Sequence, residues 1–269
     1  MTKTKKEDIS NPKMKIIQDL INNINYDAPI IEVTKGIFWT AVISRYCGLS
    51  STMFRDCAAD KNTAMYPEKP YTEMTALELS QFALASDIAR ASVGLAAINS
   101  LLEPDYSRCT EVNASDILLE YGKNKNVSVI GHFPFTDDLK KTTKNLWVIE
   151  KWQRPGDYPE VDAQKFLPIS DIVAISSTTL INHTLTDLLK LCPNTAIKML
   201  LGPTTPFSEV LFEHGIDIVS GSRVLDKEKA LKHIREGANF RQLKRTGAIK
   251  LLTMIGERLS SKGVVPHGE

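Results

Sequence analysis

The spacing of hydrophobic and polar residues along the chain changes near residue 110. In the later part, short runs of consecutive apolar residues alternate with stretches of helical periodicity. The apolar runs lie at residues 127–131, 146–149, 171–175, 197–201 and 216–220, and the helical stretches at 137–144, 180–191, 207–214 and 227–236. Continuous apolar strands separated by helices indicate a parallel sheet covered on both faces. We therefore predict an α/β fold, with a Rossmann-like parallel-sheet domain over residues 111–269.

The earlier part of the chain follows a different pattern. Isoleucine and leucine recur at helical intervals, and a stretch of β-branched and aromatic residues with a break at Lys35-Gly36 follows. These patterns predict a helix, a hairpin, a third strand and two further helices, over residues 14–24, 28–44, 48–54, 75–84 and 86–102. Strands followed by helices are typical of a small α+β unit, which we assign to residues 1–110.

The composition is that of a soluble globular protein. The chain has 269 residues, of which 42% are hydrophobic and 24% charged, and its net charge is +1. So small a net charge gives no long-range field, and we therefore expect neither nucleic acid nor an anionic membrane as a partner. No apolar run approaches the ~20 residues of a membrane-spanning helix, and the N-terminus lacks a signal-peptide pattern, so we expect a cytoplasmic protein.

The four cysteines are scattered along the chain. Cys47, Cys57, Cys109 and Cys192 include no Cys-x-x-Cys pair. A disulfide framework or a structural zinc site is therefore not expected, and the thiols are interpreted as small buried hydrophobic groups.

Ligands of open parallel sheets bind outside the carboxyl ends of the strands. This rule selects the predicted loops at residues 131–134, from Glu150 onward, and at residues 176–179, 202–206 and 220–223. The first loop has one glycine, Gly131, where a dinucleotide-binding fingerprint has three. A standard NAD site is therefore not expected.

His132 and Glu150 are the charged or titratable candidates in these loops. His132 can serve as a metal ligand, as a general acid or base, or as a hydrogen-bond donor to a ligand. Glu150 ends the second strand 150 − 131 = 19 positions after Gly131, where nucleotide-binding domains hold a ribose. A solvated carboxylate at a strand end is the alternative for Glu150. We take His132 as the candidate catalytic residue, and both residues as candidate metal ligands.

Hydroxyl and amide side chains gather in the loop after the third predicted strand. Thr178 and Thr179 precede the predicted helix, and Asn182 lies just inside it. Hydroxyl groups and free backbone N–H groups at a helix start can bind an anion. Simple capping of the helix by Thr178 or Thr179 is the alternative.

The loop after the fourth strand is stiffened by two prolines. Gly202, Pro203, Thr204 and Thr205 are followed by Pro206, which suits the first position of a helix capped by Thr205. Such a constrained loop favours contact with a ligand above the sheet.

Several segments together resemble a known family. They are Gly-Leu-Ala-Ala-Ile-Asn at 94–99, Gly-His-Phe-Pro-Phe at 131–135, Pro-Gly-Asp at 155–157, Asn-His-Thr at 182–184 and Gly-Pro-Thr-Thr-Pro at 202–206. This set is similar to the family described as "putative heavy-metal chelation", a domain of unknown function. The resemblance implies a domain like the N-terminal domain of enolase joined to a Rossmann-like domain, with a ligand site in the cleft between them. By position, it nominates Asn99 from the first domain and His132, Glu150, Thr178, Asn182, Gly202 and Thr204 from the second.

Two functions follow from this resemblance. The first is a small-ligand-binding protein involved in heavy-metal chelation, whose cleft holds a metal or a metal–chelator complex. Transition metals require several histidine, cysteine or carboxylate ligands together, so the hydroxyl-rich loops suit a chelator complex better than a bare ion. The alternative is an enzyme for condensation, hydrolysis or group transfer on a pterin-, flavin- or nucleotide-like metabolite. The expected cofactor is thus a transition metal or a nucleotide-like ligand, and a homodimer is left open.

Overall fold

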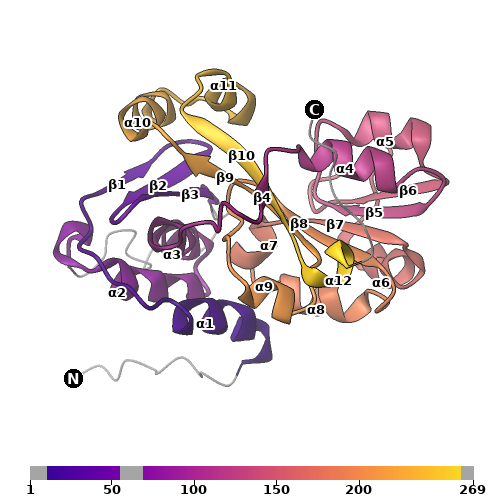
Figure 1. The fold of residues 1–269 in the computed structure, drawn as a ribbon, viewed down its shortest axis with the longest axis horizontal. Coiled ribbons are helices and arrows are strands. Elements are labelled where there is room, and N and C mark those ends of the chain that lie inside the picture. Colours follow the sequence, from indigo (N-terminus) through magenta and orange to yellow (C-terminus); the bar gives the residue numbers. More distant parts are fainter. Residues whose placement is uncertain (1–10, 55–68, 262–269) are drawn as a thin grey trace.

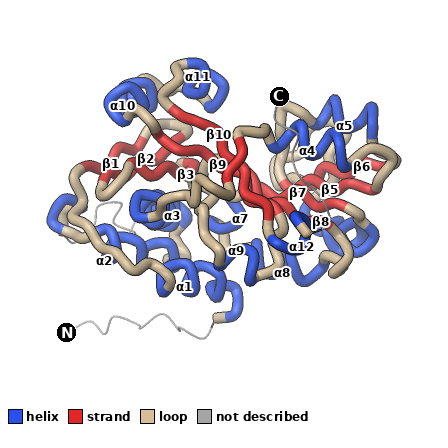
Figure 2. The backbone as a smooth tube through the Cα atoms, viewed as in Figure 1, coloured by secondary structure: helices blue, strands red, loops and turns tan. Residues whose placement is uncertain are grey.

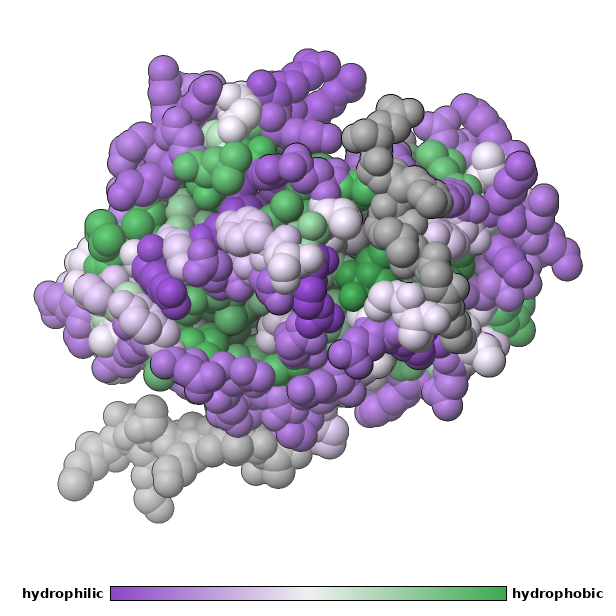
Figure 3. Space-filling model, viewed as in Figure 1, coloured by the Kyte–Doolittle hydropathy of each residue, from purple (hydrophilic) through white to green (hydrophobic). Residues whose placement is uncertain are grey.

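The strands of the protein form two sheets (Figures 1 and 2). The computed structural model describes residues 11–54 and 69–261. Strands β1 (Glu32–Lys35), β2 (Trp39–Ile43) and β3 (Cys47–Ser51) form a small antiparallel sheet in that order. The larger sheet has seven strands in the order β4-β10-β9-β8-β7-β5-β6. The described part of the chain includes no helix suited to crossing a membrane, and hydrophilic side chains cover most of the face in Figure 3.

Five strands of the larger sheet run parallel, as the sequence predicts. They are β5 (Asn126–Ile130), β6 (Asn145–Ile149), β7 (Ile172–Ser176), β8 (Ile197–Leu201) and β9 (Ile218–Val224). Numbered along the chain from β5, these strands lie in the order 2-1-3-4-5. This is the doubly wound order of the flavodoxin type, in which the chain reverses its direction of winding between the first and third strands.

The sheet continues beyond β9 with two antiparallel strands that the sequence patterns did not predict. Strand β10 (Ile249–Ile255) pairs with β9 along its whole length, and β4 (Cys109–Thr110) pairs with β10. Pairing with β10 also corrects one expectation, because residues 220–223 were predicted to be a loop after a strand. Hydrogen bonds to β10 keep these residues extended within β9.

Helices cover both faces of the larger sheet. Helices α4 (Ala114–Tyr121), α5 (Thr136–Thr142) and α12 (Glu257–Ser260) share one apolar cluster with the strands. On the other face lie α6 (Ala163–Phe166), α7 (Thr178–Ile181), α8 (Leu185–Leu191) and α9 (Val210–Glu213). Short 3-10 turns at residues 160–162 and 167–169 flank α6.

The helix predicted over residues 180–191 is two helices in the structure. His183, between α7 and α8, has a left-handed φ of 59°, which ends the first helix. Its Nε2 atom lies 2.8 Å from the carbonyl oxygen of Ala83, and Thr184 Oγ1 donates to Asn182 Oδ1 at 2.7 Å. The residue at the break thus contacts a segment 100 residues away in the chain, and a local pattern does not contain this contact.

The first part of the chain forms the predicted helices and hairpin. Helices α1 (Lys15–Asn22), α2 (Ala76–Ser80) and α3 (Ile88–Leu101) are joined to 3-10 turns at residues 12–14, 71–73 and 81–84. The small residues of α3 have a steric cause. A Cβ atom on Gly94 would lie 1.9 Å from the backbone nitrogen of Ala83. The helix therefore packs backbone against backbone on the turn before it.

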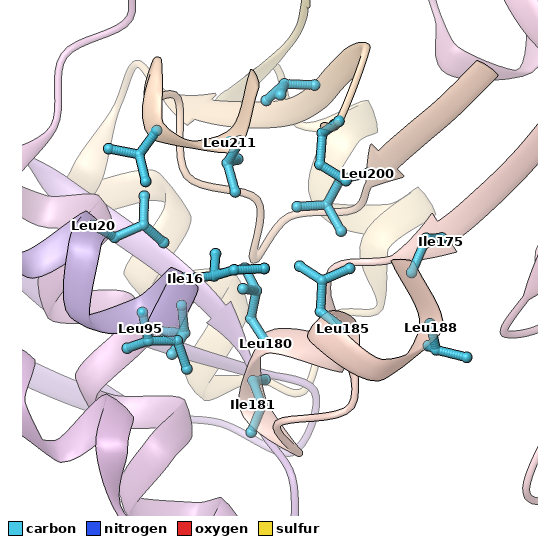
Figure 4. Packing of buried hydrophobic residues seen from close by; sticks show 14 of the residues in the cluster. Ile16, Leu20, Leu95, Ile175, Leu180, Ile181, Leu185, Leu188, Leu200 and Leu211 are labelled. Atoms are coloured by element: carbon cyan, nitrogen blue, oxygen red, sulfur yellow. The ribbon is translucent and has the colours of Figure 1, made fainter. Parts of the chain in front are cut away.

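The two parts of the chain share their hydrophobic cores. Ile16, Leu20 and Leu95 pack against Leu180 and Leu185 (Figure 4). Conversely, two helices of the later part of the chain, α10 (Lys227–Arg235) and α11 (Phe240–Arg245), cover one face of the small sheet of the earlier part (Figure 1). Each part thus supplies helices to the core of the other, which favours cooperative unfolding of the whole chain.

Replacing Leu95 by alanine tests this shared core. The side chain is fully buried, so we expect Leu95→Ala to lower the free energy of unfolding by about 2–5 kcal/mol. Urea denaturation followed by tryptophan fluorescence, in a Trp152→Phe background that leaves two tryptophans, reports on the small sheet through Trp39 and on β6 through Trp147. We expect one transition in both proteins. Leu225→Ala, at a site 61% exposed, is the control, and separate transitions for the two tryptophans would contradict the shared core.

Asp19 on α1 interacts with His214 at the end of α9, and this interaction depends on the pH. Burial raises the pKa of Asp19, but hydrogen bonds from Lys15 and His214 outweigh it and hold this pKa below the ordinary value of 3.8. His214 Nε2 lies 2.8 Å from Asp19 Oδ2. Because the pKa is lower in the folded state, the stabilisation is complete above the ordinary pKa and is lost as the pH falls through the folded-state pKa.

We therefore expect Asp19→Asn to lower the free energy of unfolding at neutral pH by about 0.2–1 kcal/mol. The difference from the parent protein should vanish once the pH falls below the lowered folded-state pKa of Asp19, where the carboxylate is protonated. Urea denaturation at a series of pH values measures both effects, with Glu120→Gln on the exposed face of α4 as the control. A difference that persists unchanged in acid would show that the charge of Asp19 is not the cause.

Candidate functional site

A cavity of about 600 Å³ lies at the carboxyl ends of β5 and β7. This is the point at which the strand order of the sheet reverses, where ligands of doubly wound proteins bind. The loops after β5, β6 and β7 form most of the lining, and the earlier part of the chain adds residues 52–54 and Ile88. The volume lies within the range of about 300–1,000 Å³ that is typical of small-molecule sites.

Gly131 and His132 follow β5 at the edge of this cavity. Gly131 has a φ of +100°, and a Cβ atom there would lie 3.1 Å from Cβ of Ser176. Glycine therefore lets the ends of β5 and β7 approach each other. The turn places His132 in the lining of the cavity, with its side chain 22% exposed.

His132 is paired with a buried carboxylate. Its Nδ1 atom lies 3.3 Å from Oδ1 and 3.2 Å from Oδ2 of Asp157, whose side chain is only 4% exposed. A carboxylate beside Nδ1 favours the tautomer with its proton on that nitrogen. Nε2 is then the ring nitrogen that accepts a hydrogen bond.

A tight turn delivers Asp157 to this position. Pro155 is followed by Gly156 with a φ of +95°, and the Asp157 N–H donates to the Arg154 carbonyl at 2.9 Å. This is the pattern of a type II turn, with proline and then glycine at its centre. Arg154 N–H also donates to Asp157 Oδ2 at 2.9 Å. Asp157 was not among the predicted site residues, although its Pro-Gly-Asp sequence is a turn signal.

Glu150 joins the loops after β5 and β6. Its Oε2 accepts a hydrogen bond from the His132 N–H at 3.0 Å, and its Oε1 accepts from the Lys151 N–H at 2.7 Å. Glu150 also lines the cavity, so the carboxylate both fixes the backbone of His132 and presents an acceptor to the cavity.

The wall of the cavity after β7 is rich in hydroxyl groups. Ser176 Oγ lies 2.9 Å from Thr178 Oγ1, and Thr179 Oγ1 donates to the Ser176 carbonyl at 2.7 Å. Thr178, Thr179 and Asn182 all line the cavity, as expected for a site at this strand end. Thr178 and Thr179 are the first two residues of α7 and do not cap it, because Ser177 holds the cap position.

The rim of the cavity combines aromatic and charged side chains. Phe54 and Trp152 are 60% and 64% exposed, which is unusual for large aromatic groups. Lys151 and Arg154 bring positive charge to the lining, and Lys151 is paired with Glu160 at 3.4 Å. None of these rim residues was predicted from the sequence, because single exposed side chains on loops carry no periodic signal.

The Gly202–Pro206 loop does not line this cavity and lies against the end of β3 and against α3. Thr204 is fully buried, and its Oγ1 accepts a hydrogen bond from the Ser51 N–H at 2.8 Å. Asn99 Nδ2 donates to the carbonyls of Leu49 and Thr204 at 2.8 and 3.0 Å. These polar groups therefore join the two parts of the chain.

Gly202, Pro203 and the backbone of Thr205 shape the rest of this loop. Gly202 has a φ of +126°, and a Cβ atom there would lie 2.7 Å from Ser177 Oγ. Pro203 follows Gly202 in a turn that the Thr205 N–H closes on the Gly202 carbonyl at 3.0 Å. Thr205 does not cap a helix, because the predicted helix at 207–214 is shorter and begins at Val210. Asn99 and Thr205 line a separate recess of about 10 Å³, which is too small for an organic ligand.

The described side chains do not fit a bare heavy-metal ion. No group of three or more His, Cys, Asp and Glu residues in the described ranges is arranged to hold a metal. Burial raises the pKa of Cys47 to about 12 and those of Cys109 and Cys192 to about 11, so these thiols are not thiolates at neutral pH. Cys57 lies outside the described residues. Asp157 and backbone N–H groups hold His132 and Glu150, the two predicted metal ligands, and no third such ligand joins them among the described residues.

Two profiles of known protein families match the sequence of this protein. The profile of the DUF364 family, described as "Putative heavy-metal chelation", matches residues 113–253, more than half of the chain. The chain belongs to the DUF364 family. A second profile with the same description, DUF4213, matches residues 17–102. The resemblance noted from the sequence motifs is therefore confirmed.

Relatives of the protein match most of its length, and two of them have solved structures with its fold. An uncharacterized protein of Methanocaldococcus jannaschii is 29% identical over 184 residues, which cover 66% of this chain and 70% of the relative. A DUF364 protein of unknown function from Desulfitobacterium hafniense is 26% identical, with a TM-score of 0.74 over 91% of this chain and 98% of its own. Another, from Pyrococcus horikoshii, has the same fold at 18% identity, with a TM-score of 0.76 over 91% of this chain and all of its own.

Asn99→Ala tests whether this residue joins the two parts of the chain. The substitution leaves the carbonyls of Leu49 and Thr204 without their donor, so we expect the free energy of unfolding to fall by about 1–3 kcal/mol. Urea denaturation measures the change. Asn22→Ala, at an exposed position of α1, is the control and should stay within about 0.5 kcal/mol of the parent. An equally small effect at Asn99 would argue against the structural role.

Proposed function

We propose that the protein binds a small organic ligand in the cavity between β5 and β7, and that this ligand is a metal–chelator complex. The proposal rests on a contrast between the size of the cavity, which suits an organic molecule, and the side chains of the described residues, which form no metal site. A volume of about 600 Å³ has room for an organic molecule, whereas the described residues bring no metal-binding group of side chains together. The chelator, and not the protein, then supplies the ligands of the metal.

The lining favours a planar and negatively charged ligand. Exposed aromatic rings at the rim of a cavity offer flat surfaces against which a conjugated ring system can stack, and Phe54 and Trp152 are two such rings. Arg154 makes no ion pair with any described side chain, so its guanidinium is available to a carboxylate or phosphate group. Ser176, Thr178 and Asn182 add polar contacts that fix orientation.

An enzyme acting on a pterin-, flavin- or nucleotide-like metabolite by condensation, hydrolysis or group transfer is the second candidate function. The pairing of His132 with Asp157 favours it, because a carboxylate that orients an imidazole is a common arrangement for general acid–base catalysis. Both candidates place the ligand in the same cavity, so binding is the first property to measure.

Calorimetric titration with two sets of probes tests the proposal. One set is Ni²⁺, Zn²⁺ and Co²⁺ as free ions, and the other is the ferric complex of 2,3-dihydroxybenzoate, FMN and pterin-6-carboxylate. We expect binding heat with at least one probe of the second set and none with the free ions. Trp152→Ala should weaken that binding by about tenfold, which corresponds to about 1.4 kcal/mol.

Tyr106→Ala is the matched control, because Tyr106 is also an exposed aromatic residue (52%) but is absent from the cavity lining. It should bind the probe as the parent protein does. Tight binding of a free ion with no response to the organic probes would overturn the proposal, as would equal loss of affinity in the two variants.

A further inference from the structure

We infer that His132 and Asp157 take a proton from the bound molecule, and that the ligand class is therefore a planar molecule with an acidic hydroxyl group, such as a catechol or an enol. The inference rests on the proposed function, because it concerns the ligand of the same cavity. It adds a chemical event, proton transfer to a named atom, to what is otherwise a binding site.

The geometry of the pair fixes which nitrogen receives the proton. Asp157 contacts Nδ1 through both carboxylate oxygens and is almost completely buried, so it holds the ring with Nδ1 protonated. The Arg154 N–H bonded to Oδ2 fixes the carboxylate, and Glu150 fixes the backbone nitrogen of His132. The loop after β6 thus positions His132 at both its ring and its backbone.

The proton transfer needs only the ligand as donor and His132 as acceptor, with no further reactant. The O–H bond of the ligand breaks, the proton passes to Nε2 of His132, and the electron pair stays on the ligand oxygen. The resulting imidazolium lies between the ligand anion and the carboxylate of Asp157, which stabilises it. The other charged groups of the cavity lining are Glu150 and Glu160, which disfavour an anionic ligand, and Lys151 and Arg154, which favour it. Lys151 is paired with Glu160, so Arg154 is the cation of the lining that faces the ligand anion without such a pairing.

Such a base acts on the chelator before it carries its metal, because the hydroxyl groups of a finished complex have already lost their protons. Hydroxyl donors must lose their protons before they coordinate a metal ion, so chelation releases protons. A hydroxylated chelator that gives its proton to His132 is converted into its metal-binding form within the cavity. The cavity would then favour the deprotonated, coordinating state of its ligand while making no bond to the metal.

The ring tautomer of His132 is the first test, and it needs no ligand. Long-range ¹H–¹⁵N NMR of the full-length protein, with His132→Gln to assign the ring, distinguishes the two neutral tautomers. We expect the proton on Nδ1 in the parent protein and a larger fraction on Nε2 in Asp157→Asn. A neutral ring protonated on Nε2 in the parent protein would overturn the inference.

The second test uses 4-nitrocatechol, whose absorption spectrum changes when its hydroxyl group loses a proton. At a pH where the free probe is protonated, we expect the bound probe to show the spectrum of its anion. His132→Gln should abolish this spectral change, Asp157→Asn should reduce it at least tenfold, and Asp157→Glu should retain part of it. His233→Gln, which alters a histidine outside the cavity lining, should behave as the parent protein does.

The outcomes separate the inference from the function on which it rests. Binding of 4-nitrocatechol with the spectrum of its neutral form overturns the proton transfer and leaves the proposed function standing. Failure of 4-nitrocatechol to bind, while FMN or pterin-6-carboxylate binds, overturns the hydroxylated ligand class. If neither 4-nitrocatechol nor any of the three organic probes of the calorimetric titration binds, the proposed function itself is wrong.

Discussion

The packing of α1 and α3 against the helices that follow β7 and β8 holds the two parts of the chain together. Ile16, Leu20 and Leu95 enter the same apolar cluster as Leu180 and Leu211. Around this cluster, polar groups fix the register of the contact, with Asn99 bonded to the loop after β8. The cavity lies beside the same contact, so its shape depends on how the two parts meet. The position of residues 52–54 and Ile88 at its edge follows from that packing.

Much of the fold follows from local patterns in the sequence. The amphipathic spacing of Ile16, Ile17, Leu20 and Ile21 predicts α1 and its buried face, and the five apolar runs predict the parallel strands. The antiparallel addition of β10 was not predicted, although residues 249–255 are themselves a mostly apolar run, because such a run does not record the antiparallel pairing with β9. Local periodicity records which residues are buried, but it does not record the partner against which they are buried.

The candidate site was predicted in part, and the two loops with similar chemistry show why. The loops after β7 and β8 both contain glycine or hydroxyl residues at a strand end, and the sequence gives no reason to separate them. In the structure, the first loop lines the cavity. In the second loop, the Thr204 hydroxyl accepts a hydrogen bond from the Ser51 N–H and contacts the other part of the chain. A constrained loop indicates that its backbone position matters. It does not indicate whether the neighbour is a ligand or another part of the protein.

The position of the cavity also links binding to stability. A ligand that contacts both Trp152 in the loop after β6 and Phe54 after β3 touches the two parts of the chain at once. Such a ligand binds the folded, joined state and not the unfolded chain, so its binding free energy adds to the stability of the joined state. The same reasoning explains why a site at this contact needs few strong protein ligands. In the proposed function, the shared core has already brought the two surfaces together, so a modest set of aromatic, hydroxyl and charged groups would be enough to select a ligand between them.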